Sequence, residues 1–452
     1  MSADSDPTWV WRYCNPLSLV DFPDKFQDNI YDLDRMNLTQ AQLPFSPWSD
    51  SYWPSYQGSI AQRYADPRMP KSSQFKDYDN YLTKINPAIN LVKNNQINLM
   101  SPSEKYDFLM NDPNFTLTNK ILENTRSRNK NPESWEGLCH GWAPASYMYQ
   151  RPSRSITLYN AAGKAVTFRP SDIKALNTLL WARLSYKTKF IGGRCNIQNP
   201  KTDEIGRILD KDCNDNNPGS FHLALINQIG INKRSLVFDA TYDYQVWNQP
   251  ITAYNLTYYN PETGSISKRA QDVMIAKEKY SKDKFKKYRS REGDSVVGVK
   301  LTVDYVLETK PSTKESDSPA NDSVTQVTYY YDLELNSKTG KVVGGEWHQK
   351  GHPDFLWTPS AGSEISSNIV PKTNSHFGPL FMYHHYWWID SPRSTVTDWL
   401  PYSISAAKQM TVPLENIVRA LTAWSSNPIE DGILPEAAQQ PNIPEKYKWA
   451  RQ

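Results

Sequence analysis

Proline most limits how this chain can fold. The 452 residues include 32 prolines but only 19 glycines. Because proline ends or kinks a helix, we expect residues 1–70 to be irregular. Residues 72–130 look mostly helical, with breaks expected at Pro87, Pro102 and Pro113. Together with 12% aromatic residues, this composition predicts a loop-rich protein with aromatic-lined clefts.

Length and charge restrict the class of protein. At roughly 100–200 residues per domain, the chain should form two or three domains or one large one. The 51 Lys and Arg residues and 48 Asp and Glu residues give a net charge of +3, without the basic excess typical of a nucleic-acid binder. No apolar run reaches the roughly 18 residues of a membrane span. We therefore expect neither a nucleic-acid partner nor a membrane span.

Hydrophobic patterns predict the main elements. Leu176, Leu179, Leu180 and Leu184 lie at helical spacing within residues 173–186. The short apolar runs 221–231 and 235–238 are predicted to form two adjacent buried strands. The stretches 296–307 and 325–335 are rich in β-branched and aromatic residues, so we expect two further strands there.

Polar stretches lie between and after these elements. Residues 310–322 are rich in Ser, Pro and Asp and predict a mobile loop. The charged stretch 268–291 is interpreted as a solvated face rather than a patch for an anionic partner. Pro413 should begin a helix with one apolar face.

The resulting fold class is α+β. We divide the chain into four consecutive segments: a mostly helical and irregular region at 1–130, a core segment at 131–265, a β-rich section at 266–400, and a helical tail at 401–452 that packs on the core. The second segment, 131–265, is the expected catalytic core segment, because it contains the candidate Cys, His and Asp residues described next.

Residues 135–145 carry the most informative chemistry. Cys139 lies between Gly137 and Gly141, and Pro144 can lie in the first turn of a following helix. A thiol near a helix N-terminus is favoured as thiolate, which is the nucleophilic form. A lone cysteine is more often a small buried apolar residue, so this segment alone leaves both interpretations open.

A thiol nucleophile needs a base, and the base needs an orienting acceptor. His222 lies in one apolar run, and Asp239 ends the next. Two neighbouring strands would place them side by side, with Asp239 accepting from one imidazole nitrogen while the other faces the sulfur. Asp243 is a second candidate for the acid, and His222 would equally suit a core histidine. The order Cys, His, Asp is that of thiol acyl-transfer enzymes.

Other polar residues are assigned weaker roles. His140 is a poor base for Cys139, because adjacent residues point to different sides of an element. His352 has no convincing metal-binding spacing, and Asp354 is expected to hold the β-rich section together. Residues 210–215 resemble half a calcium loop but lack its glycine and closing glutamate. The sequence therefore requires no cofactor, and it leaves calcium elsewhere open.

The cysteines give one structural expectation. Cys195 and Cys213 lie in a polar segment and are predicted to form a disulfide worth about 3 kcal/mol. No Cys-x-x-C pair is present, which argues against a structural zinc site.

Five rare blocks resemble one known family. They are residues 48–54 (Trp-Ser-Asp-Ser-Tyr-Trp-Pro), 139–145 (Cys-His-Gly-Trp-Ala-Pro-Ala), 246–250 (Val-Trp-Asn-Gln-Pro), 344–347 (Gly-Gly-Glu-Trp) and 352–357 (His-Pro-Asp-Phe-Leu-Trp). In this order they resemble the transglutaminase-elicitor family, the oomycete cell-wall transglutaminases and their bacterial relatives. The blocks extend over about two-thirds of the chain.

The resemblance implies a function and a site. It implies a papain-like or transglutaminase-like thiol-enzyme core and protein-glutamine γ-glutamyltransferase activity on proteins carrying Gln and Lys and on small primary amines. Cys139 matches the family's nucleophile block directly, and His222 and Asp239 complete the expected triad. The family also implies secretion, although Met1 is not followed by a signal peptide.

Two other classes of function stay open. A cysteine peptidase or protein glutamine deamidase would use the same triad but let water resolve the acyl enzyme. A non-catalytic binding protein on a decayed enzyme fold would keep the scaffold without a reactive thiolate.

Overall fold

The computed structural model divides the chain into two compact units. It describes residues 15–369 and 399–426, apart from 195, 196, 198, 199, 206, 208, 211, 212, 214, 215, 242, 243 and 350. Unit 1 comprises Met1–Pro47, Lys187–Leu307 and Val324–Ala361. Unit 2 comprises Trp48–Tyr186, Glu308–Ser323 and Gly362–Gln452. The units interleave along the chain, which is a different division from the four consecutive segments expected from composition.

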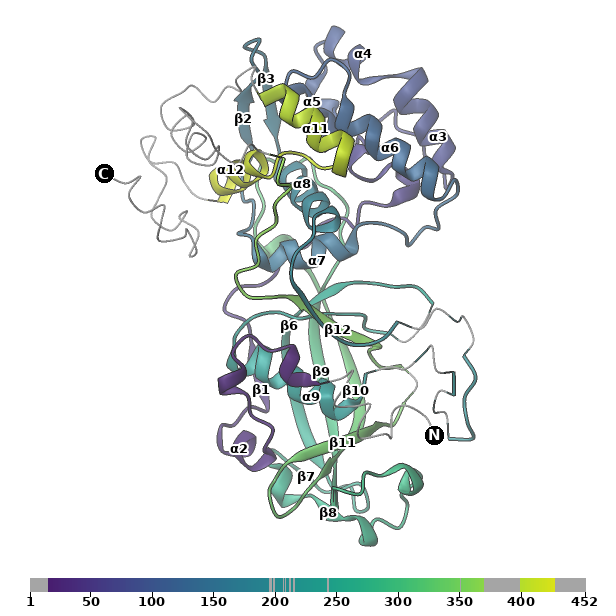
Figure 1. Ribbon diagram of the computed structural model, residues 1–452, viewed down its shortest axis with the longest axis vertical. Coiled ribbons are helices and arrows are strands. Elements are labelled where there is room, and N and C mark those ends of the chain that lie inside the picture. Colours follow the sequence, from purple (N-terminus) through teal and green to yellow (C-terminus); the bar gives the residue numbers. More distant parts are fainter. Residues whose placement is uncertain are drawn as a thin grey trace, which may run out of the picture. The chain divides into compact units, whose positions relative to one another are not determined.

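Unit 1 is built on one antiparallel sheet (Figure 1). In the described residues its main order is β11-β10-β9-β6-β5-β12-β4, with β1 and β7 added to β6 and β8 added to β9. The strand bounds are β1 Gln40–Gln42, β4 Thr188–Gly192, β5 Val237–Phe238, β6 Gln249–Tyr259, β7 Ile266–Ser267, β8 Ile275–Ala276, β9 Ser295–Leu307, β10 Ser323–Leu335, β11 Val342–Trp347 and β12 Phe355–Pro359.

The long strands follow their sequence pattern. The two strands predicted at 296–307 and 325–335 are confirmed as β9 and β10. Along β9, Val299 and Leu301 are fully buried while Lys300 between them is exposed. This alternation is what a sheet with one face on the core requires. The helices α2 (Ile30–Arg35) and α9 (Pro218–Leu225) contribute to the same core.

One predicted strand of unit 1 is a helix. Residues 221–231 belong to α9 and to the π-helical turn Ile226–Ile231 that continues it, so the prediction of a strand here is wrong. A short, wholly apolar run fits a buried helix as well as a buried strand. The start signal decides between them: Asn217 accepts from the Gly219 N–H, and Pro218 occupies the first helical position. The second predicted strand is confirmed as β5.

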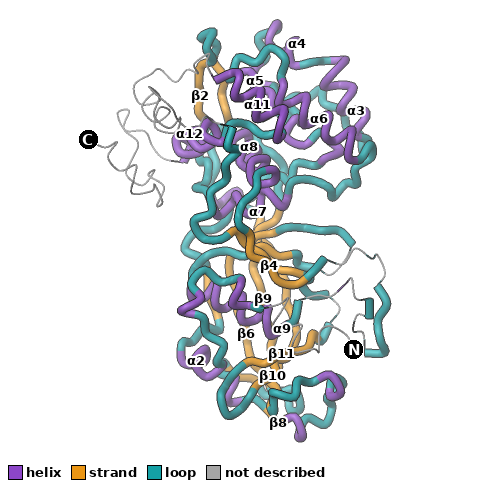
Figure 2. The backbone as a smooth tube through the Cα atoms, in the orientation of Figure 1, coloured by secondary structure: helices purple, strands orange, loops and turns teal. Residues whose placement is uncertain are grey.

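Unit 2 is mainly helical (Figure 2). Its main elements are α3 Phe75–Asn80, α4 Ala88–Lys93, α5 Pro102–Leu109, α6 Thr116–Arg128, α7 Cys139–Met148, α8 Pro170–Arg183, α11 Leu400–Met410, α12 Glu415–Ser426 and the hairpin β2 Ile156–Tyr159 with β3 Ala165–Phe168. The predicted proline breaks are confirmed, because α4 begins after Pro87, α5 begins at Pro102, and Pro113 lies between α5 and α6. The predicted amphipathic helix near the end is confirmed as α12.

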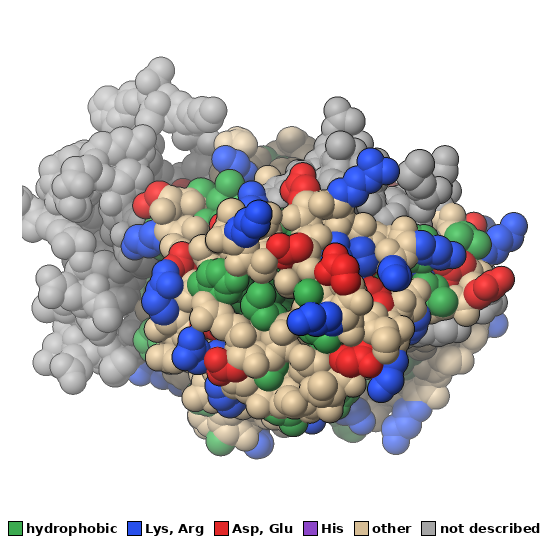
Figure 3. Space-filling model, turned by 90° about the horizontal axis from the view of Figure 1, so that it is seen from below, with side chains coloured by type: hydrophobic (Ala, Val, Ile, Leu, Met, Phe, Trp, Pro, Cys, Tyr) green, Lys and Arg blue, Asp and Glu red, His purple; other side chains and the backbone are tan. Residues whose placement is uncertain are grey.

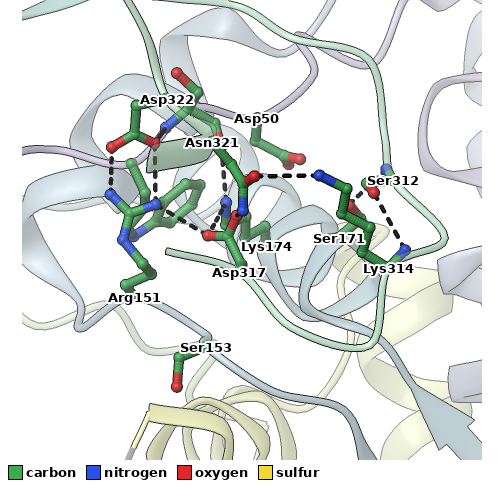
Figure 4. A network of polar contacts seen from close by, with 12 residues as sticks. Asp50, Arg151, Ser153, Ser171, Lys174, Ser312, Lys314, Asp317, Asn321 and Asp322 are labelled. Atoms are coloured by element: carbon green, nitrogen blue, oxygen red, sulfur yellow. Dashed lines mark hydrogen bonds and ion pairs between the residues drawn. The ribbon is translucent and has the colours of Figure 1, made fainter. Parts of the chain in front are cut away.

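The loop between β9 and β10 belongs to unit 2 and is held there by ion pairs (Figure 4). Arg151 pairs with Asp317 at 2.9 Å and with Asp322 at 2.5 Å. Lys174 from α8 lies 2.8 Å from the same Asp317 carboxylate. The mobility of this loop stays a prediction, but its acidic residues have cationic partners in unit 2 that local composition does not reveal.

The surface and the helices agree with the composition. On the face seen in Figure 3, basic and acidic side chains are interspersed, as expected for a net charge of +3 over 452 residues. Within the described part of the chain, no helix combines the length and apolar character needed to cross a bilayer.

Candidate active site

Cys139 is the first residue of α7 in unit 2, as predicted. Its side chain is 5% exposed and is not in a disulfide. The N–H groups of Gly141 and Trp142 both donate to the Leu138 carbonyl, which begins the helix. The first-turn N–H groups of a helix have no intrahelical acceptor and carry its positive dipole end. The thiol thus lies where a thiolate and a developing oxyanion are stabilised.

Pro144 lies deeper in the helix than predicted. It is the sixth residue of α7 rather than part of the first turn. The proline ring removes one intrahelical hydrogen bond of α7. A tryptophan two residues earlier bonds the helix to another segment of unit 2. Trp142 is fully buried, and its indole Nε1 donates to the Trp48 carbonyl at 3.0 Å.

Gly141 allows α7 to pack directly on the backbone of α8. A Cβ atom at this position would lie 2.2 Å from the Thr178 carbonyl oxygen and 2.6 Å from the Ala182 Cβ. Both neighbours lie in α8, so neither can move away from the new methyl group without distorting that helix.

We therefore expect Gly141→Ala to lower the free energy of unfolding of unit 2 by about 1–3 kcal/mol, the usual cost of overpacking. Thermal unfolding followed by circular dichroism measures it. Gly344→Ala is the matched control, because its Cβ would meet nothing nearer than 3.8 Å. Equal melting temperatures for the Gly141→Ala variant and the wild type would contradict the close helix contact.

His222 lies inside the core of unit 1. It is 1% exposed on α9, and its Nδ1 shares a 2.8 Å hydrogen bond with the Tyr331 hydroxyl, while Nε2 has no hydrogen-bond partner among the described residues. Burial lowers the pKa of His222 to about 3, so the imidazole is neutral at physiological pH. The predicted hydrogen bond from His222 to Asp239 is wrong, because a helical His222 points among the tyrosines of the sheet rather than along a neighbouring strand.

Asp239 directly follows β5 and is buried. Its carboxylate accepts from the Trp247 N–H at 2.9 Å and, more weakly, from the Thr241 N–H at 3.4 Å. These bonds close the turn that leads from β5 to β6. The alternative acid, Asp243, lies outside the described residues.

A second histidine lies at the same edge of the sheet as Asp239. Strand β12 pairs antiparallel with β5, with Leu356 opposite Phe238. The residues just before β12 therefore lie at the sheet edge that Asp239 occupies just after β5. These residues include His352 and Asp354, and both Asp239 and Asp354 act electrostatically on the Tyr329 hydroxyl.

The ring of His352 is held by stacking. It lies parallel to the Trp347 indole, with 8° between the planes and 5.0 Å between the centroids. Its Nδ1 is 3.3 Å from the Pro353 carbonyl, and the side chain is 6% exposed. Metal-binding spacing, the feature by which the sequence is judged for a histidine site, does not identify His352. The sequence carries only the His-x-Asp run just before β12, because the pairing of β12 with β5 is not visible in it.

The other predictions concern cofactors and cysteines. Among the described residues, no three His, Cys, Asp or Glu side chains are grouped as a metal site would require. Cys213 is fully buried, but Cys195 lies outside the described residues, so the predicted disulfide stays a prediction. Calcium binding also stays open.

Comparison with known proteins identifies the family. A family model described as Transglutaminase elicitor matches residues 22–373. The crystal structure of the GP42 transglutaminase from Phytophthora sojae has a similar fold, with a TM-score of 0.50 and 23% sequence identity over 77% of this chain and 90% of that chain. No curated protein matches the sequence. The α+β class is confirmed, whereas a papain-like core stays a prediction. Because the family model covers well over half of its length, the chain belongs to the transglutaminase elicitor family.

Proposed function

We propose that this protein is a protein-glutamine γ-glutamyltransferase that joins Gln side chains to Lys or other primary amines. The observation that carries the proposal is the thiol of Cys139 at the N-terminus of α7, within the family's Cys-His-Gly-Trp block. A helix N-terminus lowers the free energy of a thiolate relative to a thiol. Membership of the family supplies the reaction class.

The proposed reaction has two halves. The Cys139 thiolate attacks the side-chain amide of a protein glutamine, and an imidazolium protonates the departing ammonia, which leaves a thioester. A primary amine then attacks the thioester, the imidazole takes its proton, and an isopeptide bond forms as the thiolate is released. The backbone N–H of Cys139 is proposed to bind the oxyanion in both halves. Asp239 is proposed to orient the imidazole.

Two histidines compete for the acid–base role. His222 stays a prediction from the sequence, but its apolar surroundings and its low pKa oppose protonation. A general acid–base group works best with a pKa near the working pH. His352 is favoured, because it lies at the edge of the sheet where Asp239 and Asp354 also lie.

Replacing each histidine separately decides between them. We expect His352→Ala to lower kcat for amine incorporation by about 10²–10⁴-fold, the usual contribution of general acid–base catalysis. We expect His222→Phe, which keeps the ring volume in the core, to lower kcat by no more than about threefold. Steady-state kinetics with a fluorescent amine measures both. The reverse order of effects, in variants that melt cooperatively, would restore the assignment to His222.

One assay tests the function against its alternatives. The wild-type protein is incubated with a glutamine-bearing protein and a fluorescent primary amine, in calcium and separately in chelator. Incorporated label supports the proposal. Ammonia release without label identifies a deamidase, and backbone cleavage identifies a peptidase. If none of these occurs and the Cys139 thiol alkylates slowly, the chain is a binding protein on an inactive scaffold.

The place of action follows from the same proposal. We propose that the protein is secreted, as the sequence resemblance implies, and that it acts on extracellular proteins carrying Gln and Lys. Fractionation of the source cells, with an antibody against the folded protein, tests this.

A further inference from the structure

The loop that leads into α7 is hydrogen-bonded to residues 52–55, a second segment of unit 2. The Leu138 N–H donates to the Tyr52 carbonyl at 2.6 Å, and the Ser55 N–H donates to the Glu136 carbonyl at 2.8 Å. A Cβ atom on Gly137 would lie 2.4 Å from the Tyr52 carbonyl oxygen. The backbone just before the nucleophile therefore rests directly on the backbone of Tyr52.

Tyr52 also reaches the nucleophile's surroundings with its side chain. Its hydroxyl donates to the Ser134 carbonyl at 2.7 Å. Burial, with the neighbouring charges of Tyr56, Glu308 and Cys139, raises the pKa of Tyr52 to about 12. A displacement of Tyr52 would thus change both the position of the loop and the surroundings of the Cys139 thiol.

The next residue, Trp53, holds Tyr52 in place. Trp53 is fully buried and has a φ of 48°, a left-handed conformation that is unfavourable for a bulky side chain. Such a conformation persists only where its surroundings fix it. Its N–H donates to the Ser51 hydroxyl at 3.0 Å, and its indole Nε1 donates to the Asp50 carboxylate at 3.0 Å.

Asp50 joins this segment to the ion pairs of unit 2. Its carboxyl is 2% exposed and lies near Lys174 of α8 and Asp317 of the 308–323 loop (Figure 4). Its backbone carbonyl accepts from the Thr309 N–H at 2.8 Å. Burial raises the pKa of Asp50 to about 7, although the positive charge of Lys174 opposes this shift.

We propose that Asp50 is a positioning residue for Cys139: through Trp53 it fixes the Tyr52 carbonyl against the loop that begins α7, and so it raises the reactivity of the thiol. An ionised carboxylate is a stronger acceptor for the indole N–H than a neutral acid. The segment is therefore held more firmly above neutral pH than below it. The inference rests on the proposed role of Cys139 as nucleophile.

The sign of the effect separates positioning from simple electrostatics. If the charge of Asp50 acted on the thiol only through space, it would disfavour the thiolate, and removing it would speed alkylation of Cys139. Positioning predicts the opposite, since loss of the carboxylate releases the loop. Asp50→Asn keeps the volume and removes the charge, whereas Trp53→Phe keeps the Asp50 charge and removes only the indole donor.

The test is the rate of alkylation of Cys139 by iodoacetamide from about pH 5 to about pH 9, a range that includes the ordinary thiol pKa. Peptide mass spectrometry identifies the labelled residue, and thermal unfolding checks the fold. Alkylation follows the ionisation of the thiol in every variant, and we expect the wild type to show a further inflection near pH 7, where Asp50 ionises. We expect Asp50→Asn and Trp53→Phe to lose this inflection and to react about tenfold more slowly above it, as for the loss of one hydrogen bond. Glu315→Gln, which removes a charge at an exposed site of the neighbouring 308–323 loop, should keep the wild-type profile.

Each outcome bears on the inference by itself. Folded Asp50→Asn protein with the wild-type profile, or with faster alkylation, overturns it. Loss of the inflection in Asp50→Asn but not in Trp53→Phe also overturns it, because Asp50 would then act on Cys139 without the hydrogen bond from the Trp53 indole. Alkylation that follows the expected profile in a wild type that incorporates no amine would end the proposed function and leave this inference standing.

Discussion

Replacing Cys139 by alanine is expected to lower amine incorporation by about 10⁴-fold or more, to the level of the uncatalysed background. The Cys139 sulfur is the only protein atom in the proposed reaction that forms a covalent bond to the glutamine substrate. No neighbouring group can replace it. The first turn of α7 stays intact in this variant, because the backbone N–H groups of Gly141 and Trp142 donate to the Leu138 carbonyl. Fluorescent-amine transfer measures the loss.

A control on the same helix separates chemistry from folding. Ser146→Ala also removes a buried polar group from α7, one that donates to the Ala143 carbonyl at 2.6 Å. We expect this variant to keep at least about a third of the wild-type rate, since losing such a local bond costs on the order of 1 kcal/mol of stability and touches no reacting atom. A folded Cys139→Ala protein that still transfers amine at the wild-type rate would remove the thiol from the mechanism.

The second large effect is expected at Arg289 in unit 1. Its guanidinium is 3% exposed and bonds to both carboxylate oxygens of Asp332, at 2.5 and 2.8 Å, and to Asp283 at 3.0 Å. Arg289→Met keeps most of the volume but leaves these carboxylates buried without their cation. We expect a loss of about 3–5 kcal/mol in the free energy of unfolding, the usual result of breaking a buried ion pair on one side. Urea unfolding measures it, and Arg291→Met, an exposed arginine two positions away, is the control.

The pH dependence of this site has a definite sign. Arg289, together with His348, lowers the pKa of Asp332 to about 2 against the opposing effect of burial. Because the folded pKa is below the ordinary value of 3.8, the stabilisation is present above about pH 4 and is lost as the pH falls toward 2. The Arg289→Met variant should show a flatter decline of stability over this acidic range. An unchanged acid-unfolding curve in the variant would contradict the pairing.

Much of the fold could be predicted because local patterns determine it. Alternating β-branched residues identified β9 and β10, and one apolar stripe identified α12. The position of Cys139 at a helix start was also predictable, because glycines and a proline surround it.

The rest depended on partners far away in the sequence. Arg289 was interpreted as part of a solvated face, but its partner Asp332 lies on β10, and composition cannot reveal that pairing. The apolar run around His222 has no period of its own and predicts a strand equally well, whereas the helix that forms buries the histidine. The role of His352 is not visible in the sequence, because its relation to Asp239 exists only once β12 pairs with β5.

The path of the chain through the two units limits how the protein can be dissected. Each unit is assembled from three separate stretches, and the 308–323 loop returns to unit 2 between two strands of unit 1. A cut at any one peptide bond between residues 48 and 361 therefore divides both folded bodies. Separate expression of either half would require circular permutation or coexpressed pieces, and a single protease nick in this loop would sever a connection without releasing a domain.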